Sequence, residues 1–153
     1  MTVYLDTCSL QRPLDDKSQL RIRLEAEAVL SIIDLVEDGT IDLISSDALA
    51  YETERNPHPT RQQFVWEVVT ESSSHVEFSD QVESRVEELN QTGIKTLDSL
   101  RLVSAEEGGA DFFCTCDDSF LNKAKRGARG ETKPVSPLDL AEEIEKWQSQ
   151  QDR

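Results

Sequence analysis

Four acidic side chains fall at places where the sequence predicts that a buried strand has just ended or a helix has just begun: Asp6, Glu52, Asp98 and Asp117. Asp6 directly follows the apolar run 3–5, and a single residue separates Asp117 from the apolar run 111–115. Ligands of a parallel α/β sheet bind beyond the carboxyl ends of its strands. We therefore expect the four carboxylates to share one cleft at that edge of the sheet.

Several carboxylates in one cleft repel one another, and burial makes each charge more costly. A hard divalent cation removes that repulsion, and ligands that offer only oxygen suit Mg²⁺ or Mn²⁺. Such a site activates water and stabilises the charge that builds on a phosphate during in-line attack. The four acids therefore predict metal-dependent hydrolysis of a phosphodiester bond.

Each acid taken alone also has a structural explanation. Asp98 and Asp117 suit helix starts, where a negative charge gains about 0.3–1 kcal/mol from the helix dipole. Glu52 suits an exposed position on a helix, whereas an acid such as Asp6 at the end of a buried strand needs a partner or a metal. Asp118 either supports the site or caps the helix beside Asp117, and we favour the cap.

Predicted strands and helices alternate along the chain. Apolar runs predict strands at residues 3–5, 41–44 and 111–115, with shorter ones at 76–78 and 135. Apolar residues at helical spacing predict helices over residues 22–36, 48–51, 61–71, 80–89, 97–107, 117–126 and 137–147. In the helix over residues 97–107, the spacing assigns the buried face to Leu97, Leu100, Val103 and Ser104. This alternation is typical of an α/β sandwich with a mainly parallel sheet.

The composition describes one folded domain over residues 1–153. The chain is 37% apolar and carries a net charge of −15, from 31 acidic and 16 basic side chains. Domains of about 100–150 residues are common, and this apolar content is enough for a core. A strongly acidic protein does not coat nucleic acid by bulk attraction. No apolar run approaches the ~18–20 residues that span a bilayer, and the first residues lack the features of a signal peptide.

The cysteines indicate a cytoplasmic protein without disulfides. Their number is odd, with Cys8, Cys114 and Cys116, so a closed disulfide framework is not expected and a reducing compartment is the default. They form no CxxC pair, and the two histidines, His58 and His75, lie in polar segments. We therefore expect buried thiols rather than a zinc site.

The charge is unevenly spread, and one segment is basic. Between residues 123 and 133 five basic side chains face a single acid, Glu131. Four of them are candidates for contacts with substrate phosphates: Lys123, Lys125, Arg126 and Arg129. A solvated helix end followed by a loop explains the same run equally well.

Four short motifs follow one another along residues 1 to about 125. The first is Val3-Tyr4-Leu5-Asp6-Thr7-Cys8, and the second runs from Ser45-Ser46 through Tyr51-Glu52 to Asn56-Pro57. The third is Leu97-Asp98-Ser99-Leu100 with Ala105, and the fourth is Ala110-Asp111-Phe112-Phe113-Cys114-Thr115-Cys116-Asp117 with Phe120. In this order and spacing they resemble the PIN-domain nucleases, a family that includes VapC-like toxins.

The resemblance implies a three-layer α/β/α fold and a ribonuclease that depends on Mg²⁺ or Mn²⁺. Asp6, Glu52, Asp98 and Asp117 match the four acids of the family, which hold one or two metal ions there. Thr7 and Thr115 match the hydroxyl positions beside the first and last acids. The implied reaction is hydrolysis of RNA by metal-activated water, and the implied partner is an antitoxin protein. A homodimer is compatible with the same resemblance.

Two other classes of protein remain as alternatives. A PIN-like fold without catalysis would serve as a binding or scaffold protein, although the intact acids argue against it. A receiver-like signalling domain also has an acidic Mg²⁺ pocket, and Thr115 with Lys133-Pro134 fits part of its pattern. However, only one acid follows the first strand, and the segment 130–132 before Lys133 is not apolar.

Overall fold

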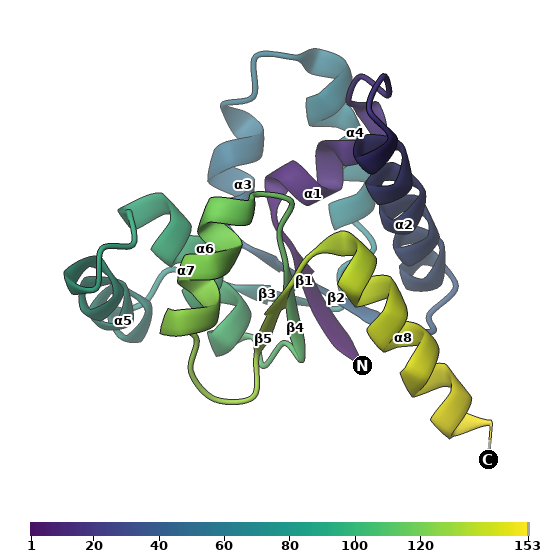
Figure 1. Ribbon diagram of the computed structural model, residues 1–153. Coiled ribbons are helices and arrows are strands. Elements are labelled where there is room, and N and C mark those ends of the chain that lie inside the picture. Colours follow the sequence, from purple (N-terminus) through teal and green to yellow (C-terminus); the bar gives the residue numbers. More distant parts are fainter. Residues whose placement is uncertain (153) are drawn as a thin grey trace.

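The structure is a computed structural model that describes residues 1–152 (Figure 1). Five strands form the sheet, namely β1 (Thr2–Leu5), β2 (Asp42–Ser46), β3 (Ser74–Val76), β4 (Phe112–Cys114) and β5 (Lys133–Val135). Around it lie α1 (Thr7–Gln11), the 3-10 turn η1 (Arg12–Leu14), α2 (Leu20–Glu37), α3 (Asp47–Glu54), α4 (Pro59–Val69), α5 (Asp80–Gln91), α6 (Thr96–Glu107), α7 (Asp118–Gly127) and α8 (Pro137–Gln151).

The five strands form one sheet in the order β3-β2-β1-β4-β5. Every neighbouring pair is parallel, with Leu5 level with Cys114 and Cys114 level with Val135. The strand order reverses direction at β1, because β2 and β3 extend the sheet to one side and β4 and β5 to the other. Such a switch point leaves a crevice at the carboxyl ends of the strands.

Helices cover both faces of the sheet, which confirms the predicted three-layer sandwich. Side chains of a strand alternate between its two faces. Val3 and Leu5 of β1 therefore pack with α2, α4 and α8, whereas Tyr4 packs with α5, α6 and α7. Figure 1 shows these two groups of helices on opposite sides of the sheet. None of the helices within residues 1–152 combines the length and the apolar character that crossing a bilayer requires.

Two features of the helices differ from the prediction. The polar segment after β1 forms α1 and η1, which sequence periodicity does not reveal because α1 has only five residues. In α6 the predicted buried face is wrong at Leu97, whose exposed fraction is 38%, whereas Leu102 is completely buried. Leu97 lies in the first turn of α6, whereas the buried face of the helix is formed by later residues, namely Ser99, Leu102, Val103, Ser104 and Ala105.

Ser46 joins the sheet to the helix that carries Glu52. As predicted, it is the N-cap of α3, and its Oγ accepts a hydrogen bond from Leu49 N at 3.0 Å. The same oxygen lies 2.7 Å from the hydroxyl of Tyr4, which is completely enclosed. Burial raises the pKa of Tyr4 well above its usual value, so this hydroxyl stays neutral. The Ser46 side chain therefore provides a hydrogen-bond partner both for a backbone N–H at the start of α3 and for the buried hydroxyl of Tyr4.

We expect Ser46→Ala to destabilise the protein by about 2–3 kcal/mol. The loss of a serine cap costs about 1 kcal/mol, and a buried hydroxyl left without a partner costs about 1–3 kcal/mol. Ser79 is a matched control, because it caps α5 through Val82 N and is joined there to no buried phenol. Urea unfolding should show a loss of only about 1 kcal/mol for Ser79→Ala. Equal losses for the two variants would contradict the double role of Ser46.

Candidate active site

Asp6 is a buried carboxylate at the switch point of the sheet. Its backbone N–H donates to the carbonyl oxygen of Cys114 at the end of β4, 3.1 Å away. Its side chain is 2% exposed and accepts hydrogen bonds from Ser9 N at 2.9 Å and Cys8 Sγ at 3.0 Å. Within residues 1–152 no basic side chain forms an ion pair with it. Burial raises the pKa of Asp6, and hydrogen bonds from Thr115, Cys8 and Ser9 offset part of that rise.

Glu52 lies on α3, and both of its carboxylate oxygens are engaged. Arg101 donates to them from Nε at 2.8 Å and from Nη2 at 2.7 Å. Thr7 Oγ1 donates to Oε2 of the same carboxylate at 2.7 Å. The Glu52 side chain is 11% exposed. The acid and the hydroxyl that the resemblance assigns to the site are therefore in direct contact.

Asp98 lies in the first turn of α6, and the same arginine joins it to Glu52. Arg101 follows Asp98 by three residues on α6, and its Nη1 donates to Asp98 Oδ1 at 2.5 Å. Sequence reasoning missed Arg101. A separation of three residues puts two helical side chains side by side, so the pair with Asp98 has a local signal, but the contact with Glu52 joins residues 49 positions apart.

Asp117 is the N-cap of α7, where its Oδ1 accepts a hydrogen bond from Phe120 N at 3.1 Å. It is exposed. Its backbone N–H donates to Thr115 Oγ1 at 3.2 Å, and Thr115 in turn contacts Asp6, so one threonine links the first and last acids. The preferred interpretation of Asp118 as the cap is wrong, because the extended backbone of residue 117 directs the Asp117 side chain at the helix end.

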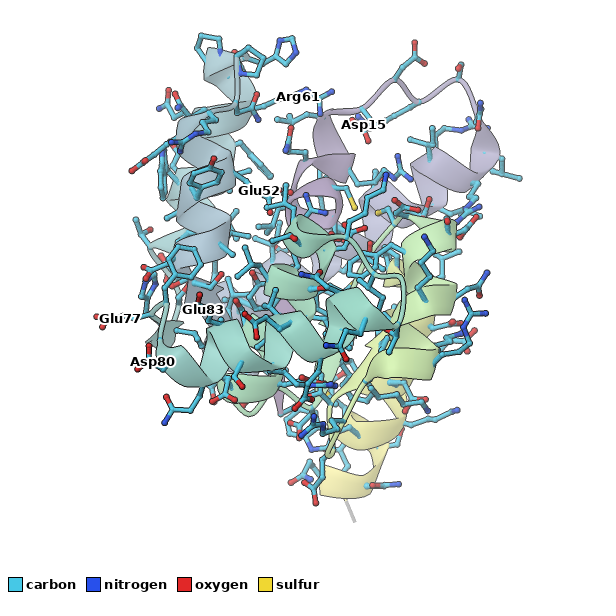
Figure 2. All side chains as sticks on the ribbon, turned by 90° about the vertical axis from the view of Figure 1, so that its left-hand side faces the viewer. Asp15, Glu52, Arg61, Glu77, Asp80 and Glu83 are labelled. Carbon is cyan, nitrogen blue, oxygen red and sulfur yellow. The ribbon has the colours of Figure 1, made fainter. Side chains whose placement is uncertain are left out.

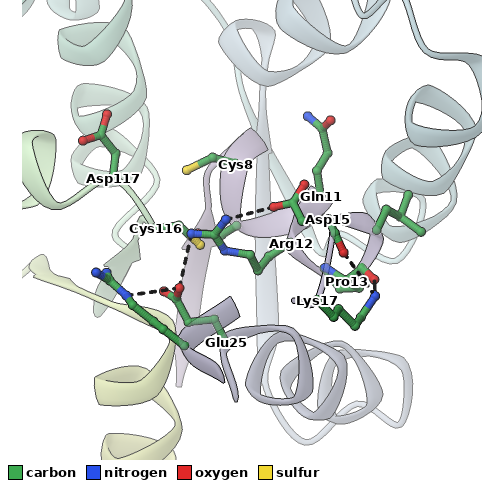
Figure 3. A network of polar contacts seen from close by, with 12 residues as sticks. Cys8, Gln11, Arg12, Pro13, Asp15, Lys17, Glu25, Cys116 and Asp117 are labelled. Carbon is green, nitrogen blue, oxygen red and sulfur yellow. Dashed lines mark hydrogen bonds and ion pairs between the residues drawn. The ribbon is translucent and has the colours of Figure 1, made fainter. Parts of the chain in front are cut away.

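Asp118 belongs instead to a chain of charged residues beside the site. Arg21, at the start of α2, donates to both of its oxygens, at 2.7 and 2.6 Å. Arg21 also lies 3.4 Å from Glu25, which is 1% exposed and lies 3.2 Å from Arg12 on η1. Figure 3 shows Arg12 between Glu25 and Asp15, with Asp117 drawn apart from them, just before α7. This network, which sequence reasoning also missed, joins α2, η1 and the start of α7.

The cysteines gather under the site as thiols. Ser9 Oγ lies 3.7 Å from both Cys114 Sγ and Cys116 Sγ, and Cys8 Sγ lies 3.5 Å from Thr115 Oγ1. A hydrogen bond between Cys8 and Cys116 raises the pKa of Cys8 and lowers that of Cys116. All three are free cysteines.

Three of the four predicted basic residues lie on α7 and form no ion pair with the described residues. Within residues 1–152, Lys123, Lys125 and Arg126 form none, whereas Arg129 pairs with Glu88 on α5. Lys133, which the receiver-like alternative requires at a strand end, opens β5 instead and pairs with Glu143 at 3.6 Å. Lys133 is level with Phe112, two residues before the carboxyl ends of β4 and β5 at Cys114 and Val135. It therefore lies away from the edge of the sheet where Asp6 lies.

The donor set at this edge has the chemistry of a divalent-cation site. Four carboxylates and two hydroxyls offer only oxygen, as Mg²⁺ and Mn²⁺ prefer, and Asp6 is buried without an ion pair. In the described part of the chain, no three Asp, Glu, His or Cys side chains converge closely enough to hold an ion together. Figure 2 shows Glu52 apart from the acidic group Glu77, Asp80 and Glu83.

Comparison with known proteins defines the fold. No protein-family model matches the chain, and no curated protein matches its sequence. Its structure is similar to that of VapBC2 from Rickettsia felis bound to a DNA fragment from their promoter, with a TM-score of 0.57 and 16% identity over 89% of this chain and 98% of the other. It is also similar to PAE2754 from Pyrobaculum aerophilum, with a TM-score of 0.55 and 14% identity over 95% of this chain and 90% of the other.

These likenesses confirm a VapC-like PIN-domain fold. Because both identities are low, they define the fold alone, and the activity has to be argued from the site.

We expect Asp6→Asn to stabilise the metal-free protein at neutral pH. A raised pKa means that the ionised carboxylate costs stability above the usual Asp pKa of about 3.9 and costs nothing well below it. Removal of the buried charge should therefore raise Tm, by about 2–4 °C for each kcal/mol regained in a chain of this size. The gain should disappear when thermal melts are repeated below pH 3.9.

Asp117→Asn is the matched control for Asp6→Asn. Asp117 is exposed, and asparagine caps a helix as well as aspartate does. Its Tm should therefore stay close to that of the unmodified protein. A loss of stability for Asp6→Asn at neutral pH would show that the Asp6 charge is already balanced within the chain.

Proposed function

We propose that the protein is a metal-dependent endoribonuclease whose Mg²⁺ or Mn²⁺ is held by Asp6, Glu52, Asp98 and Asp117. The observation that carries the proposal is the buried Asp6 carboxylate, which lies at the switch point of the sheet without an ion pair. A buried anion in that position needs a positive charge, and parallel α/β sheets bind their ligands beyond the carboxyl ends of the strands at such a switch point. When bound, the ion lowers the pKa of water and stabilises charge on a phosphate.

The chain's own residues prepare the site in distinct ways. Ser9 N and Cys8 orient the Asp6 carboxylate, and Thr7 orients the Glu52 carboxylate. Thr115 holds the backbone of Asp117 close to Asp6. These donors fix the oxygens before any ligand arrives, which reduces the reorganisation that binding requires. Thr7 and Thr115 therefore act as positioning residues.

RNA is the proposed substrate, and α7 is the proposed contact surface. Asp117 caps the start of this helix, and Lys123, Lys125 and Arg126 follow along it. With a rise of ~1.5 Å per residue, these cations lie ~9–14 Å along the helix from Asp117, which is within a few nucleotides of the cleaved bond. Arg129 is a weaker candidate because Glu88 already pairs with it.

A protein partner is also part of the proposal. The similar VapBC2 structure contains a DNA fragment from their promoter. By analogy, this chain would be the toxin of a toxin–antitoxin pair and would bind an antitoxin, and it would form a homodimer through a surface away from Asp6. This analogy rests on fold alone, and the nuclease proposal does not depend on it.

One observation favours a second function, that of a non-catalytic scaffold with the same fold. Arg101 balances Glu52 and Asp98 with a guanidinium, as a purely structural ion pair would. A scaffold of this kind would bind a partner and leave RNA intact. Cleavage assays separate the two functions.

We expect the purified protein to cleave RNA with Mg²⁺ or Mn²⁺ and to stop when EDTA is added. Asp6→Asn and Asp117→Asn should each reduce the rate by more than the ~10–100-fold that outer-shell substitutions cost. Glu77→Gln is the control, because Glu77 is exposed and lies apart from Glu52 (Figure 2). Full metal-dependent activity in both Asp variants would remove these acids from the site. Intact RNA under all metal conditions would favour the scaffold.

Replacement of Lys123, Lys125 and Arg126 by glutamine should weaken RNA binding uniformly across sequences. Each phosphate contact that is lost should flatten the slope of log K against log salt concentration by about 0.7 for single-stranded RNA. Lys133→Gln is the control, because Lys133 lies at the amino end of β5 and pairs with Glu143. Fluorescence anisotropy over a range of KCl concentrations measures the slope. An unchanged slope would make these residues an ordinary solvated surface.

A further inference from the structure

Arg101 lies between two of the four carboxylates that we propose as metal ligands. Its guanidinium contacts Glu52 through Nε and Nη2 and Asp98 through Nη1, so one side chain joins two of the four proposed ligands. We infer that Arg101 is an internal cation that holds Glu52 and Asp98 together in the metal-free protein and that a divalent ion must displace it to bind. This inference rests on the proposed metal-dependent function and names the residue that controls metal entry.

The contact is well defined and largely shielded from water. The side chains of Glu52, Arg101 and Asp98 are 11%, 20% and 22% exposed. Bidentate arginine–carboxylate contacts are directional as well as charged. Although burial lowers the pKa of Arg101, its hydrogen bonds with Glu52 and the charges of Glu52, Asp6 and Asp98 raise it above its usual value. The guanidinium therefore keeps its charge beside the acids.

A metal ion and the guanidinium cannot occupy this position together. Glu52 already accepts three hydrogen bonds, two from Arg101 and one from Thr7. A carboxylate has about four acceptor positions over its two oxygens, so metal coordination competes directly with the Arg101 contacts. A divalent ion would also be repelled by a guanidinium a few ångströms away. Metal binding therefore has to replace the Arg101 contacts rather than add to them.

Arg101 can leave by rotation of its side chain alone. Its backbone is fixed in the middle of α6, whereas its side chain retains a 20% exposed fraction. The contact with Glu52 spans from α6 to α3. Rotation of the side chain would break it without moving either helix. Breaking these contacts costs free energy, and this cost lowers the apparent affinity for the metal. The same reduction occurs whenever the conformation that binds a ligand is only partly populated.

Removal of the internal cation should therefore tighten metal binding. We expect Arg101→Met to bind Mn²⁺ about tenfold more tightly or better, in the range by which outer-shell residues alter metal affinity. Arg101→Lys keeps a positive charge but loses the bidentate contact, and it should fall between Arg101→Met and the unmodified protein. Isothermal titration calorimetry, and electron paramagnetic resonance of free Mn²⁺, measure this affinity without any cleavage assay.

Thermal melts provide a second readout. In EDTA, Arg101→Met should melt at a lower temperature than the unmodified protein, because Glu52 and Asp98 are left as neighbouring anions without a cation. Saturating Mn²⁺ should raise its Tm by more than it raises that of the unmodified protein. Arg101→Lys extends the same comparison if Arg101→Met folds poorly.

Arg85→Met is the matched control. Arg85 makes the same kind of contact from α5 to Glu106 on α6, through Nε at 3.1 Å and Nη2 at 3.2 Å. Its side chain is 13% exposed, and that of Glu106 is 10% exposed. Arg85→Met should also lower Tm in EDTA, but its Mn²⁺ affinity and its Mn²⁺-induced change in Tm should equal those of the unmodified protein.

The outcomes distinguish this inference from the proposed function. The inference is supported if the Arg101 variants bind Mn²⁺ more tightly than the unmodified protein. It is also supported if the Arg101 variants bind Mn²⁺ and the unmodified protein does not. Equal or weaker binding overturns the inference, while Mn²⁺ binding by the unmodified protein leaves the proposed function intact. If neither the unmodified protein nor the Arg101 variants bind Mn²⁺, both the inference and the metal-dependent function are wrong.

Discussion

The need to balance several negative charges at one edge of the sheet shapes the whole site. Each acid is compensated differently. Asp117 stays in solvent at a helix N-terminus, where the dipole favours its charge. Glu52 and Asp98 share Arg101. Asp6 has hydrogen-bond donors but no ion pair among the described residues, and burial raises its pKa. The compensation is therefore incomplete at the most buried position, which is where an added cation would gain most.

Sheet topology explains why Asp6 and Thr115 lie close together. Asp6 leaves β1 and Thr115 leaves β4, and the two strands are neighbours because the strand order reverses there. Beside this edge, Glu25 forms ion pairs with both Arg12 and Arg21. A buried carboxylate between two arginines adds little stability as a pair, but loss of one partner leaves an uncompensated charge. The main effect of the Glu25 network is to fix η1 and the starts of α2 and α7 relative to one another.

The sequence predicted the strands, the layers and the elements that carry the acids, because apolar periodicity and helix caps are local. Ser46 shows this well, since its position before an apolar helix predicts the observed cap. Local patterns failed at α1, which is too short for periodicity, and at Leu97, which is exposed although its spacing places it with the buried residues of α6. They could not reveal Arg101 with Glu52, because that contact joins distant residues through the fold.

The net charge of −15 is compatible with an RNA substrate once distance is considered. At physiological salt the screening length is about 8 Å, so acids on another surface contribute little to the potential along α7. Lys123, Lys125 and Arg126 form no ion pair within residues 1–152. A phosphate near α7 therefore meets a local positive field. The acidic remainder would disfavour nonspecific binding of long RNA, which directs such a protein toward a short segment that reaches the acids.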